Sequence, residues 1–587
     1  MENLDIARIL EELADLLEIQ GANPFRIRAY RNAVRTVEDL TRPIRSMVQE
    51  GEDLAELPAI GNDIAGHITE LLQTGRIGRL EEVAAQFPRS LVELMRLDGV
   101  GPKKARKLFD ELDIKTVEDL AAAIDEGRVE ALSGFGKKSA QKIGRAIEDH
   151  RRHGGRFLID EAEKLIAGVV DFVGAAPGVE RVEVAGSLRR RKETIGDIDL
   201  LAQSDGDGTP VVEHFAGYPA AERVEVSGST KGNIVLASGL SIDLRVIPRR
   251  SFGAALQYFT GSKEHNVAVR ARAVRRGLRV NEWGVFRVPE GADPATLARD
   301  EGERIGGSEE AEVYEAMGLT FIPPELRENR GEVEAALEGR LPRLVTVDDI
   351  RGDLQMHSTW SDGKASVEEM ARACLDRGYA YLAITDHSPA MAMVQGLTPE
   401  RAREQWKEIE EVRERVAGIE ILRSAEVDIL KDGNLDLPDE TLAELDVVVV
   451  SVHTFMDQDR TTMTDRVIRA LRHPAVDILA HPTGRLLNRR EPFDMEVEPV
   501  LEAAAELGVA VELNANPNRL DLSDTHVSRA RALGVKVVIS TDAHSPKGLG
   551  NMRFGVDQAR RGWLEPDDVL NCLPLDGLQD WLGRREG

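Results

Sequence analysis

The pattern of apolar and polar positions divides the chain into three kinds of segment. Over roughly the first 150 residues, apolar side chains recur every three to four positions, as in IARILEELADLLEIQ, and this spacing predicts amphipathic helices. From about residue 155, alternating runs such as RVEVAGS, IGDIDLLAQ and LSIDLRVI predict strands mixed with helices. Beyond about residue 347 the runs become continuously apolar, as in LDVVVVSVH, which is typical of strands buried in a parallel sheet. The sequence therefore predicts a multidomain chain with helical, α+β and barrel-like parts.

The C-terminal apolar runs share a second property, because five of them end in histidine or acidic residues. Together with two positions further upstream, these strand ends provide His357, His387, Glu426, His453, His481, Glu512, Asp542 and His544. In an α/β barrel the strand ends at one rim carry the chemistry, and imidazoles with carboxylates suit Zn²⁺ or Mn²⁺. The alternative is that each histidine is packed separately in the core. Their recurrence at equivalent strand ends favours one shared metal site.

Composition narrows the class of protein. The 587 residues are 42% apolar and 30% charged, which is typical of a soluble protein of several domains, and no apolar run reaches membrane-spanning length. The acidic, amphipathic first segment is not expected to be a signal peptide. Cys374 and Cys572 lie far apart, which argues against a disulfide scaffold or cysteine zinc finger and indicates the cytoplasm. The net charge of −27 argues against a general nucleic-acid coat protein, although basic clusters interrupt the acidic chain.

An internal repeat lies in the helical segment. LPAIGNDIAGHI, LDGVGPKKARKL and LSGFGKKSAQKI share one plan of apolar residues and glycines. The repeat resembles the helix-hairpin-helix, whose glycine turn lets the backbone approach a DNA phosphate without reading the base sequence. On this resemblance the DNA contacts are Gly61, Gly99, Gly101, Lys103, Lys104, Gly134, Gly136 and Lys137. The alternative is ordinary capping of helix C-termini by glycine.

A second constellation of carboxylates lies in the α+β segment. Asp197 and Asp199 are two positions apart on one predicted strand, so both point to the same face, and Asp243 lies on another. Three such carboxylates can hold two Mg²⁺ ions about 4 Å apart for nucleotidyl transfer. Gly186 and Ser187 lie at a strand-to-helix turn suited to a triphosphate. A lone pair of aspartates is more often a surface turn, but the upstream GSLRR and the third aspartate favour a catalytic site.

The motifs GSLRRRKETIGDIDLL, SIDLRVI and YFTGSKEHN resemble those of family X DNA polymerases of the polymerase beta kind, over residues 1 to about 325. The resemblance implies that Asp197, Asp199 and Asp243 bind two Mg²⁺ or Mn²⁺ ions and that Asp243 assists activation of the primer 3′ hydroxyl. It implies nucleotide contacts from Gly186, Ser187, Arg190, Gly196, Tyr258, Phe259, Gly261 and Asn266. By the same resemblance, the YFTG segment excludes ribose, and Arg270 contacts the template strand.

One departure from this family concerns abasic-site chemistry. Its lyase-competent members use a lysine of the first hairpin repeat to form a Schiff base, and here the matching position is His67. No lysine precedes Lys103, and an imidazole does not replace a primary amine in this reaction. We therefore expect little or no lyase activity by that route.

The motifs DLQMHSTWSDG, AITDHS, SAEVDI, SVHTFM, LAHPTGR and STDAHS resemble those of the polymerase-and-histidinol-phosphatase (PHP) domain, over residues 347 to about 575. Carried over by motif, the ligands of two or three Zn²⁺ or Mn²⁺ ions are His357, Asp362, His387, Glu426, His453, His481, Asp542 and His544. Gln355 stands where the family usually has its first histidine, and a neutral amide is a weaker ligand. Arg485 and Arg519 are plausible phosphate contacts.

These observations predict six segments: helical residues 1–88 and 89–153 with the hairpin repeats, a nucleotidyltransferase palm at 154–250, a thumb at 251–325, a linker at 326–346, and a distorted (β/α) TIM-like PHP barrel at 347–580. The preferred hypothesis is a cytoplasmic repair polymerase that uses gapped or primer-template DNA and deoxynucleoside triphosphates. Its PHP domain is expected to be a 3′-5′ exonuclease, with abasic-site or 3′-phosphate processing left open.

Three alternative hypotheses remain. In the first, the polymerase is active and the PHP domain is only a metal-stabilised structural support. In the second, the chain is a scaffold that binds DNA ends or gaps with little catalysis, and in the third, the C-terminal half is a small-molecule phosphatase. The sequence leaves the oligomeric state and the metal in each site open.

Overall fold

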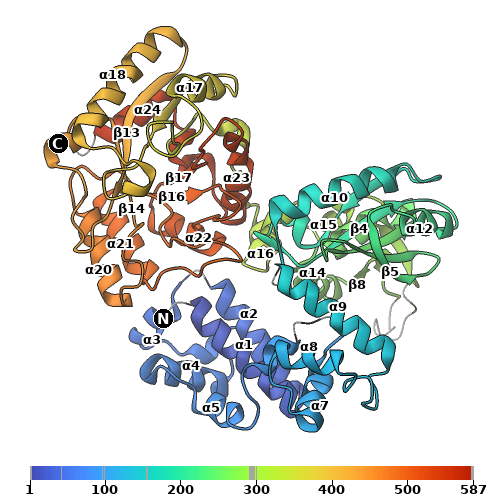
Figure 1. Ribbon diagram of the computed structural model, residues 1–587. Helices are drawn as coiled ribbons and strands as arrows, with labels where there is room; N and C mark the ends of the chain where they lie inside the picture. The colour runs from blue at the N-terminus through green and yellow to red at the C-terminus, as the bar shows by residue number, and fades with distance from the viewer. Residues whose placement is uncertain are drawn as a thin grey trace. The chain divides into compact units, whose positions relative to one another are not determined.

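The computed structural model of this chain (Figure 1) describes residues 3–40, 42–95, 97, 99–153, 156–289, 298 and 300–583. The chain divides into two compact units, one of residues 1–157 with 235–241 and the other of residues 158–234 with 242–587. Among the described residues, none of the helices has the length and apolar character needed to cross a lipid bilayer.

The first unit is helical, as the periodic apolar pattern predicts. Its helices are α1 (Asn3–Gln20), α2 (Pro24–Asp39), α3 (Ile44–Gln49), η1 (Leu54–Glu56), α4 (Asn62–Thr74), α5 (Gly78–Ala84), α6 (Leu91–Met95), α7 (Pro102–Leu112), α8 (Val117–Asp125) and α9 (Lys137–His153). One hydrophobic core runs from Ile6 on α1 to Ile147 on α9. The two predicted helical domains, residues 1–88 and 89–153, therefore share a single core.

The three hairpin repeats have the same turn geometry. Gly99 and Gly134 have φ values of +84° and +88°, a region that favours glycine, and Ala59 occupies the equivalent position of the first repeat with φ +60°. Gly61 and Gly101 then adopt extended backbone and cap α4 and α7. The glycines therefore form the turn that enters each second helix, as the helix-hairpin-helix resemblance implies.

The second unit begins with the palm, a five-stranded sheet in the order β2-β4-β7-β6-β5. Its elements are α10 (Ile159–Gly174), β2 (Arg181–Val184), α11 (Gly186–Arg189), β3 (Thr194–Ile195), β4 (Asp197–Gln203), α12 (Thr209–Ala216), β5 (Ala221–Ser227), β6 (Lys231–Leu236) and β7 (Ser241–Ile247). The apolar side of α10, with Ile166, Val169 and Val173, is buried where the helix packs on β2 and β4. Successive side chains of a strand point to opposite faces, so the side chains on the other face of this sheet are available for the site described below.

The thumb follows the palm. It contains α13 (Phe252–Thr260), α14 (Lys263–Arg275), β8 (Leu278–Asn281), β9 (Gly284–Arg287), β10 (Glu303–Gly306) and α15 (Glu310–Ala316), and the three strands form an antiparallel sheet. The segment expected to be a linker around a short helix holds that helix, α16 (Glu332–Glu338). Val333 and Ala336 of α16 pack with Val269 and Tyr314 in the thumb core. This segment is therefore a packed extension of the thumb.

The C-terminal part is a parallel barrel, shown from yellow to red in Figure 1. Its strands pair in chain order: β11 (Gly352–Asp353), β12 (Tyr381–Ile384), β13 (Glu420–Asp428), β14 (Val447–Ser451), β15 (Ile478–Leu479), β16 (Ala510–Asn514) and β17 (Val537–Ser540). A parallel bridge between Met356 and Ala543 joins the segments that follow the first and last strands. The predicted TIM-like architecture is confirmed.

Helices surround this barrel: α17 (Val367–Leu375), α18 (Pro399–Arg415), α19 (Asp439–Leu442), α20 (Arg460–Leu471), α21 (Val497–Leu507), α22 (Asp524–Leu533), α23 (Met552–Arg561) and α24 (Leu575–Leu582). Val448 and Val450 of β14 belong to the core that also includes apolar residues of these helices, whereas Val447 and Val449 belong to a second core with residues of neighbouring strands. Both faces of the strand are buried, which explains its continuous apolar run.

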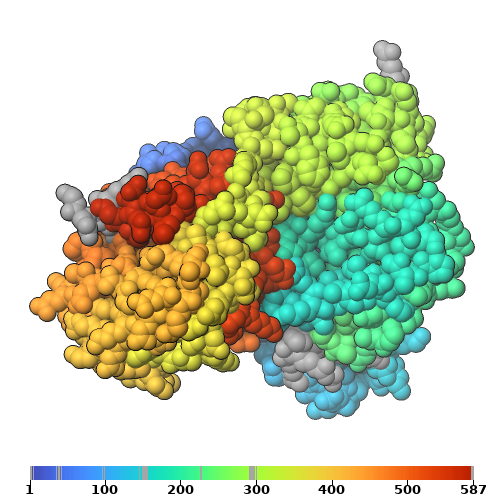
Figure 2. All heavy atoms as spheres, turned by 90° about the horizontal axis from the view of Figure 1, so that it is seen from above, coloured from blue at the N-terminus to red at the C-terminus, as the bar shows by residue number. Residues whose placement is uncertain are grey.

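The barrel contacts the palm and thumb within this second unit. In Figure 2 the red C-terminal segment lies between the yellow and orange barrel atoms and the cyan palm atoms. Asp557 on α23 pairs with Arg191 of the palm, and Arg560 pairs with Glu325 at the end of the thumb. The barrel is therefore joined to the polymerase-like part by specific ion pairs as well as by the chain.

Candidate functional sites

The predicted carboxylates lie on adjacent strands of the palm. Asp197 and Asp199 are on β4, and Asp243 is on its neighbour β7. Burial, followed by the charges of Asp197 and Asp243, raises the pKa of Asp199 to about 6. Asp197 and Asp199 line the cavity described below, and Asp243 lies on the adjacent strand. Three carboxylates on adjacent strands are a donor set that fits Mg²⁺ or Mn²⁺.

The turn after β2 explains the glycine of GSLRR. Gly186 has φ +63°, and a Cβ atom built on it would lie only 2.7 Å from Oδ2 of Asp199. The backbone N–H of Ala185 donates to the carbonyl of Asp199 at 2.8 Å, which fixes the turn against β4. Only a residue without a side chain lets α11 begin this close to the carboxylates.

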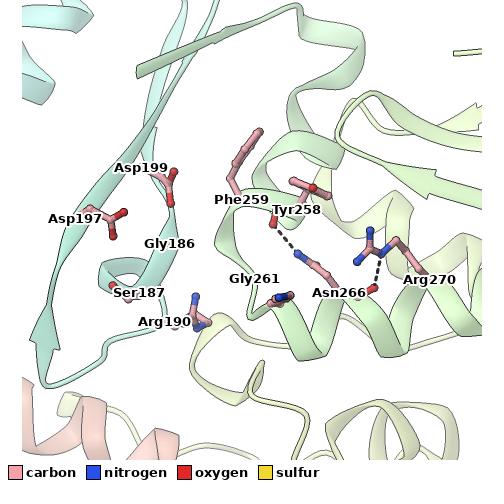
Figure 3. A pocket seen from close by; sticks show the side chains of 11 residues that line it. Gly186, Ser187, Arg190, Asp197, Asp199, Tyr258, Phe259, Gly261, Asn266 and Arg270 are labelled. Carbon is pink, nitrogen blue, oxygen red and sulfur yellow. Dashed lines mark hydrogen bonds between the residues drawn. The ribbon is translucent and has the colours of Figure 1, made fainter. Parts of the chain in front are cut away.

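A cavity of about 360 Å³ separates these aspartates from the thumb (Figure 3). It is lined by Gly186, Ser187, Arg190, Asp197, Asp199, Tyr258, Phe259, Gly261, Lys263, Asn266 and Arg270. Sequence reasoning missed Lys263, although it lies within the YFTGSKEHN motif. Gly196, a predicted nucleotide contact, lies between β3 and β4 and is absent from this described lining, as is Asp243.

The thumb side of the cavity is held by internal hydrogen bonds. The side-chain amide of Asn266 donates to the carbonyl of Tyr258 at 2.7 Å, and Gln257 donates to the Asn266 oxygen at 2.8 Å. The rings of Tyr258 and Phe259 meet edge to face with centroids 5.1 Å apart. Arg270 donates to the Asn266 carbonyl at 3.1 Å and is exposed. The predicted sugar, base and template contacts therefore form one preorganised wall.

Arg190 is fixed on the palm side of the cavity. Its Nη1 donates to the carbonyl of Thr260 at 2.6 Å, and its Nε donates to Glu328 at 3.1 Å. A Cβ atom on Gly261 would lie 3.1 Å from Nη1, so the glycine leaves room for the guanidinium. In Figure 3 the Arg190 side chain reaches the cavity between Ser187 and Gly261.

The predicted DNA contacts of the first unit differ in their availability. Those that are exposed are Gly61, Gly101, Lys103, Gly134, Gly136 and Lys137. Lys104, in contrast, donates to the carbonyl of Gly99 at 2.8 Å and to Ser139 Oγ at 3.2 Å. Lys104 therefore braces its own hairpin turn, whereas Lys103 and Lys137 are the cations available to a phosphate.

The position that matches the Schiff-base lysine of the lyase-competent polymerases is His67. His67 lies on α4, and the Tyr30 hydroxyl is 2.8 Å from its Nδ1. The two rings stack with centroids 6.0 Å apart. An imidazole packed against tyrosine supplies no amine at this position.

The barrel brings together all eight side chains predicted to bind metal: His357, Asp362, His387, Glu426, His453, His481, Asp542 and His544. Glu426 lies at their centre. Its Oε1 is 2.9 Å from Nε2 of His481 and 3.5 Å from Nε2 of His453. Its Oε2 is 3.2 Å from Nδ1 of His387 and 3.5 Å from Nε2 of His357. The Glu426 carboxylate from β13 could therefore contribute one oxygen to each of two neighbouring metal positions.

The opposite side of this cluster is formed by Asp362. Its carboxylate is 3.2 Å from Nε2 of His544 and 3.7 Å from Nε2 of His387. The side chains of Asp362 and His544 are 29% and 36% exposed, whereas His357 and Glu426 are fully or almost fully buried. The cluster is therefore open to solvent on the side of Asp362 and His544.

The charges of the cluster are strongly coupled. Burial lowers the pKa of His387, but Glu426 and Asp362 outweigh burial and raise it to about 9. Burial likewise opposes the charged form of His544, and Asp362 with Asp542 raises its pKa to about 9. Burial raises the pKa of Glu426, and the surrounding histidines overcome this effect and hold it well below its ordinary range. Divalent cations bind neutral imidazole and ionised carboxylate, so they compete with these protons.

Unpartnered buried atoms support a metal site. Nδ1 of His481 is buried and has no hydrogen-bond partner among the residues that the structure describes. Nε2 of His357 and Nδ1 of His387 are also buried and face only carboxylates of the cluster among the described contacts. Both side-chain polar atoms of Gln355 are likewise buried without a hydrogen-bond partner in the described part of the chain, so its amide oxygen is available as a neutral metal ligand. Imidazoles and carboxylates in this number fit Zn²⁺ or Mn²⁺.

Other residues at the barrel rim have supporting contacts. Glu512, predicted at a strand end, lies in the middle of β16 and accepts a hydrogen bond from the backbone N–H of His481 at 2.5 Å. Arg519 Nε lies 3.5 Å from Asp542 Oδ2. Arg485 pairs with Glu193 of the palm at 2.7 Å, so it contributes to the contact with the palm. Sequence reasoning missed that role because Glu193 lies 292 positions away.

Comparisons with known proteins match these parts. The families described as "Helix-hairpin-helix domain", "SAM-like Helix-hairpin-helix tandem", "DNA polymerase beta thumb" and "PHP domain" match residues 1–77, 91–149, 255–328 and 353–516. A DNA polymerase/3′-5′ exonuclease PolX of Bacillus subtilis (strain 168) is 38% identical over 588 residues, covering 100% of both chains.

Two further relatives match parts of the chain. DNA polymerase lambda of Rattus norvegicus is 24% identical over 352 residues, covering 56% of each chain. A probable phosphatase of Thermoanaerobacter sp. (strain X514) is 29% identical over 225 residues, covering 36% of this chain and 87% of its own. With full-length similarity to PolX and a polymerase beta thumb ahead of a PHP domain, the chain belongs to the PolX family of family X DNA polymerases.

Proposed function

We propose that this chain fills short gaps in DNA as a template-directed polymerase and trims 3′ ends with its PHP domain. The observation that carries the polymerase assignment is the cavity between the β4 carboxylates and the thumb wall. The full-length similarity to a protein named as a polymerase and 3′-5′ exonuclease supports both activities. A DNA substrate supports a cytoplasmic location.

In the polymerase site, Asp197, Asp199 and Asp243 hold two Mg²⁺ or Mn²⁺ ions, which supply charge neutralisation for nucleotidyl transfer. Asp243 would assist loss of the proton from the primer 3′ hydroxyl. Arg190, with Ser187, holds the triphosphate by charge-assisted hydrogen bonds. Proximity and orientation of the two reacting groups provide much of the rate enhancement.

The thumb wall selects the nucleotide. Tyr258 and Phe259 lie against the sugar and exclude a 2′ hydroxyl, and Asn266 contacts the base edge in the minor groove. Arg270 contacts the template strand, and its exposed position beside the cavity suits that role. Hairpin turns with Lys103 and Lys137 hold phosphates of the gapped DNA, including the 5′ phosphate, without reading base sequence.

In the PHP site, the eight clustered ligands hold two or three Zn²⁺ or Mn²⁺ ions, and such ions supply a hydroxide near neutral pH. The protein's own contribution is to hold the imidazoles in place around Glu426. The more exposed side, formed by Asp362 and His544, is where a 3′ terminal phosphodiester enters. Gln355 replaces an imidazole with a neutral amide, so one ion is bound more weakly.

Two matched sets of variants test these assignments. Asp197→Ala and Asp199→Ala should abolish primer extension on gapped DNA while they preserve trimming of a recessed 3′ end with Mn²⁺. His387→Ala and Asp542→Ala should have the opposite effect. Substrates ending in a 3′ hydroxyl or a 3′ phosphate define which end is processed. Unchanged trimming in both barrel variants would exclude the PHP cluster as the nuclease.

A further inference from the structure

A helix of the PHP barrel contacts the arginine that lines the polymerase cavity. Arg561, the last residue of α23, donates from Nη1 to the backbone carbonyl of Arg190 at 2.7 Å and to Glu328 Oε1 at 3.0 Å. The same Glu328 oxygen accepts from Nε of Arg190 at 3.1 Å. Arg561 of the barrel therefore bonds the backbone carbonyl of Arg190 directly and is linked to the Arg190 side chain through Glu328.

These groups are removed from water. Arg561 is 2% exposed and Glu328 is 8% exposed, and the Arg190 side chain is 13% exposed. Burial raises the pKa of Glu328, but Lys192, Arg561 and Arg190 outweigh burial and hold the pKa well below its ordinary range. Glu328 is therefore a carboxylate that stays ionised between two guanidinium groups, where charge-assisted hydrogen bonds are strongest.

Arg561 is itself anchored in the barrel. Its Nη2 donates to Asp524, the first residue of α22, at 2.6 Å. Asp524 also accepts from Arg330, which lies between the thumb and α16, at 3.1 Å. Because a planar guanidinium presents its donors in a fixed fork, this anchoring also fixes the donor that faces Arg190.

The neighbouring residue shows that α23 holds the whole turn. Arg191 has φ +61°, a conformation that non-glycine residues rarely adopt and that persists where surrounding contacts impose it. Two of those contacts come from α23, since Gln558 donates to the Arg191 carbonyl at 2.8 Å and the Arg191 guanidinium donates to Asp557 at 2.7 Å. The guanidinium also donates to Glu163 on α10 at 2.6 Å.

The opposite side of Arg190 belongs to the thumb. Its Nη1 donates to the Thr260 carbonyl, and Gly261 leaves room for the guanidinium because a Cβ there would lie 3.1 Å from Nη1. The guanidinium is thus held by Thr260 of the thumb and by Glu328 of the segment that extends the thumb, and Arg561 of the barrel holds Glu328 and the Arg190 carbonyl. We propose that Arg561, acting through Glu328, is a positioning residue of the polymerase, which keeps Arg190 oriented towards the triphosphate. This inference rests on the assignment of Arg190 to the triphosphate proposed above.

The consequence is a requirement of the polymerase for the PHP domain that does not involve the PHP metal ligands. A misplacement of about 1 Å in a positioning group can reduce a rate by up to about a hundredfold. Thr260 continues to hold one side of Arg190, so we expect a loss of about tenfold in kcat/KM for the nucleotide, mainly through KM.

The test is single-nucleotide insertion on gapped DNA with the full chain and Mg²⁺. Glu328→Gln keeps the size of the side chain but removes its charge. Arg561→Lys keeps the positive charge but removes the planar guanidinium with its several N–H donors. Both should raise KM for the nucleotide about tenfold and leave KM for DNA and 3′-end trimming unchanged. Arg529→Lys is the matched control, because Arg529 pairs with Glu498 inside the barrel and away from the palm, and it should change none of these quantities.

The variant Arg190→Ala distinguishes failure of the positioning role of Arg561 from failure of the triphosphate assignment of Arg190. If Arg190→Ala raises KM for the nucleotide while Glu328→Gln does not, the positioning role is wrong and the triphosphate assignment stands. If Arg190→Ala has no effect, the triphosphate assignment fails and the inference fails with it. A parallel fall in insertion and trimming would indicate general loss of structure and would also overturn the proposal. Should Arg561→Lys fold poorly, Glu328→Gln decides the result.

Discussion

Replacement of Asp199 by asparagine is expected to stabilise the metal-free palm at pH 8 while it abolishes nucleotide addition. Burial, followed by the charges of Asp197 and Asp243, raises the pKa of Asp199 from 3.8 to about 6. At about 1.4 kcal/mol for each pKa unit, the ionised carboxylate destabilises the fold by about 3 kcal/mol. The amide of an asparagine carries no charge, so Asp199→Asn removes this destabilisation together with the metal ligand.

The pH dependence follows from the direction of the shift. The folded palm binds the Asp199 proton more tightly than the unfolded chain does, so its stability falls as the pH rises from about 4 to about 6. Above that range the destabilisation is complete. The gain from Asp199→Asn is therefore about 3 kcal/mol at pH 8 and about 1 kcal/mol at pH 4.5.

Hydrogen exchange of the amides in β4 and β7 measures local opening of this sheet, which avoids treating a multidomain chain as two-state. In EDTA, exchange in Asp199→Asn should slow on the order of a hundredfold at pH 8 and about fivefold at pH 4.5. Mg²⁺ should slow exchange in the unsubstituted protein more than in the variant. Asp171→Asn, an exposed carboxylate on α10, controls for net charge. Equal exchange rates for Asp199→Asn and the unsubstituted protein at pH 8 would refute the reasoning.

Three further predictions concern other positions. Gly186→Ala should lower nucleotide addition at least tenfold and preserve 3′-end trimming, because its Cβ would meet Asp199 Oδ2 at 2.7 Å; equal loss of both activities would contradict this. Borohydride trapping on an abasic 5′ end should give no strong cross-link within residues 1–90 other than at the Met1 amine, as peptide mapping would reveal. Gln355→His should raise the affinity of the PHP site for Zn²⁺ or Mn²⁺ about tenfold by calorimetry, and an unchanged affinity would show that position 355 is not a ligand.

The sequence predicts the barrel, and the grouping of histidines and carboxylates at its rim, because both depend on local pattern. Each of these histidines lies two to four positions beyond the end of a barrel strand, and parallel strands bring their carboxyl ends to one rim. His453 and His481 are separated by 28 positions, yet each lies two positions beyond its strand, β14 and β15. The hairpin turns are equally local, since Gly99 and Gly134 adopt the positive φ that their spacing implies.

What the sequence does not predict depends on partners that are distant along the chain. Arg561 and the carbonyl of Arg190 are 371 positions apart, and nothing in the local pattern around Arg561 identifies its partner. Periodicity likewise predicts the helices of residues 1–153 but does not reveal that they share one core. The packing of α16 in the thumb is missed for the same reason, because charge and glycine around a short helix are also typical of a linker.

The two faces of α23 contact both the barrel and the palm of this chain. On one face, Gly555 lets the helix approach the barrel, because a Cβ there would lie 2.5 Å from Ile539 and 2.7 Å from Ala515. On the other face, Asp557 and Arg561 contact the palm turn. Since α23 packs directly on β16 and β17, it lies against the strand that Asp542 and His544 of the cluster follow. The barrel therefore supports nucleotide binding by its fold, independently of whether its own metal ions are present.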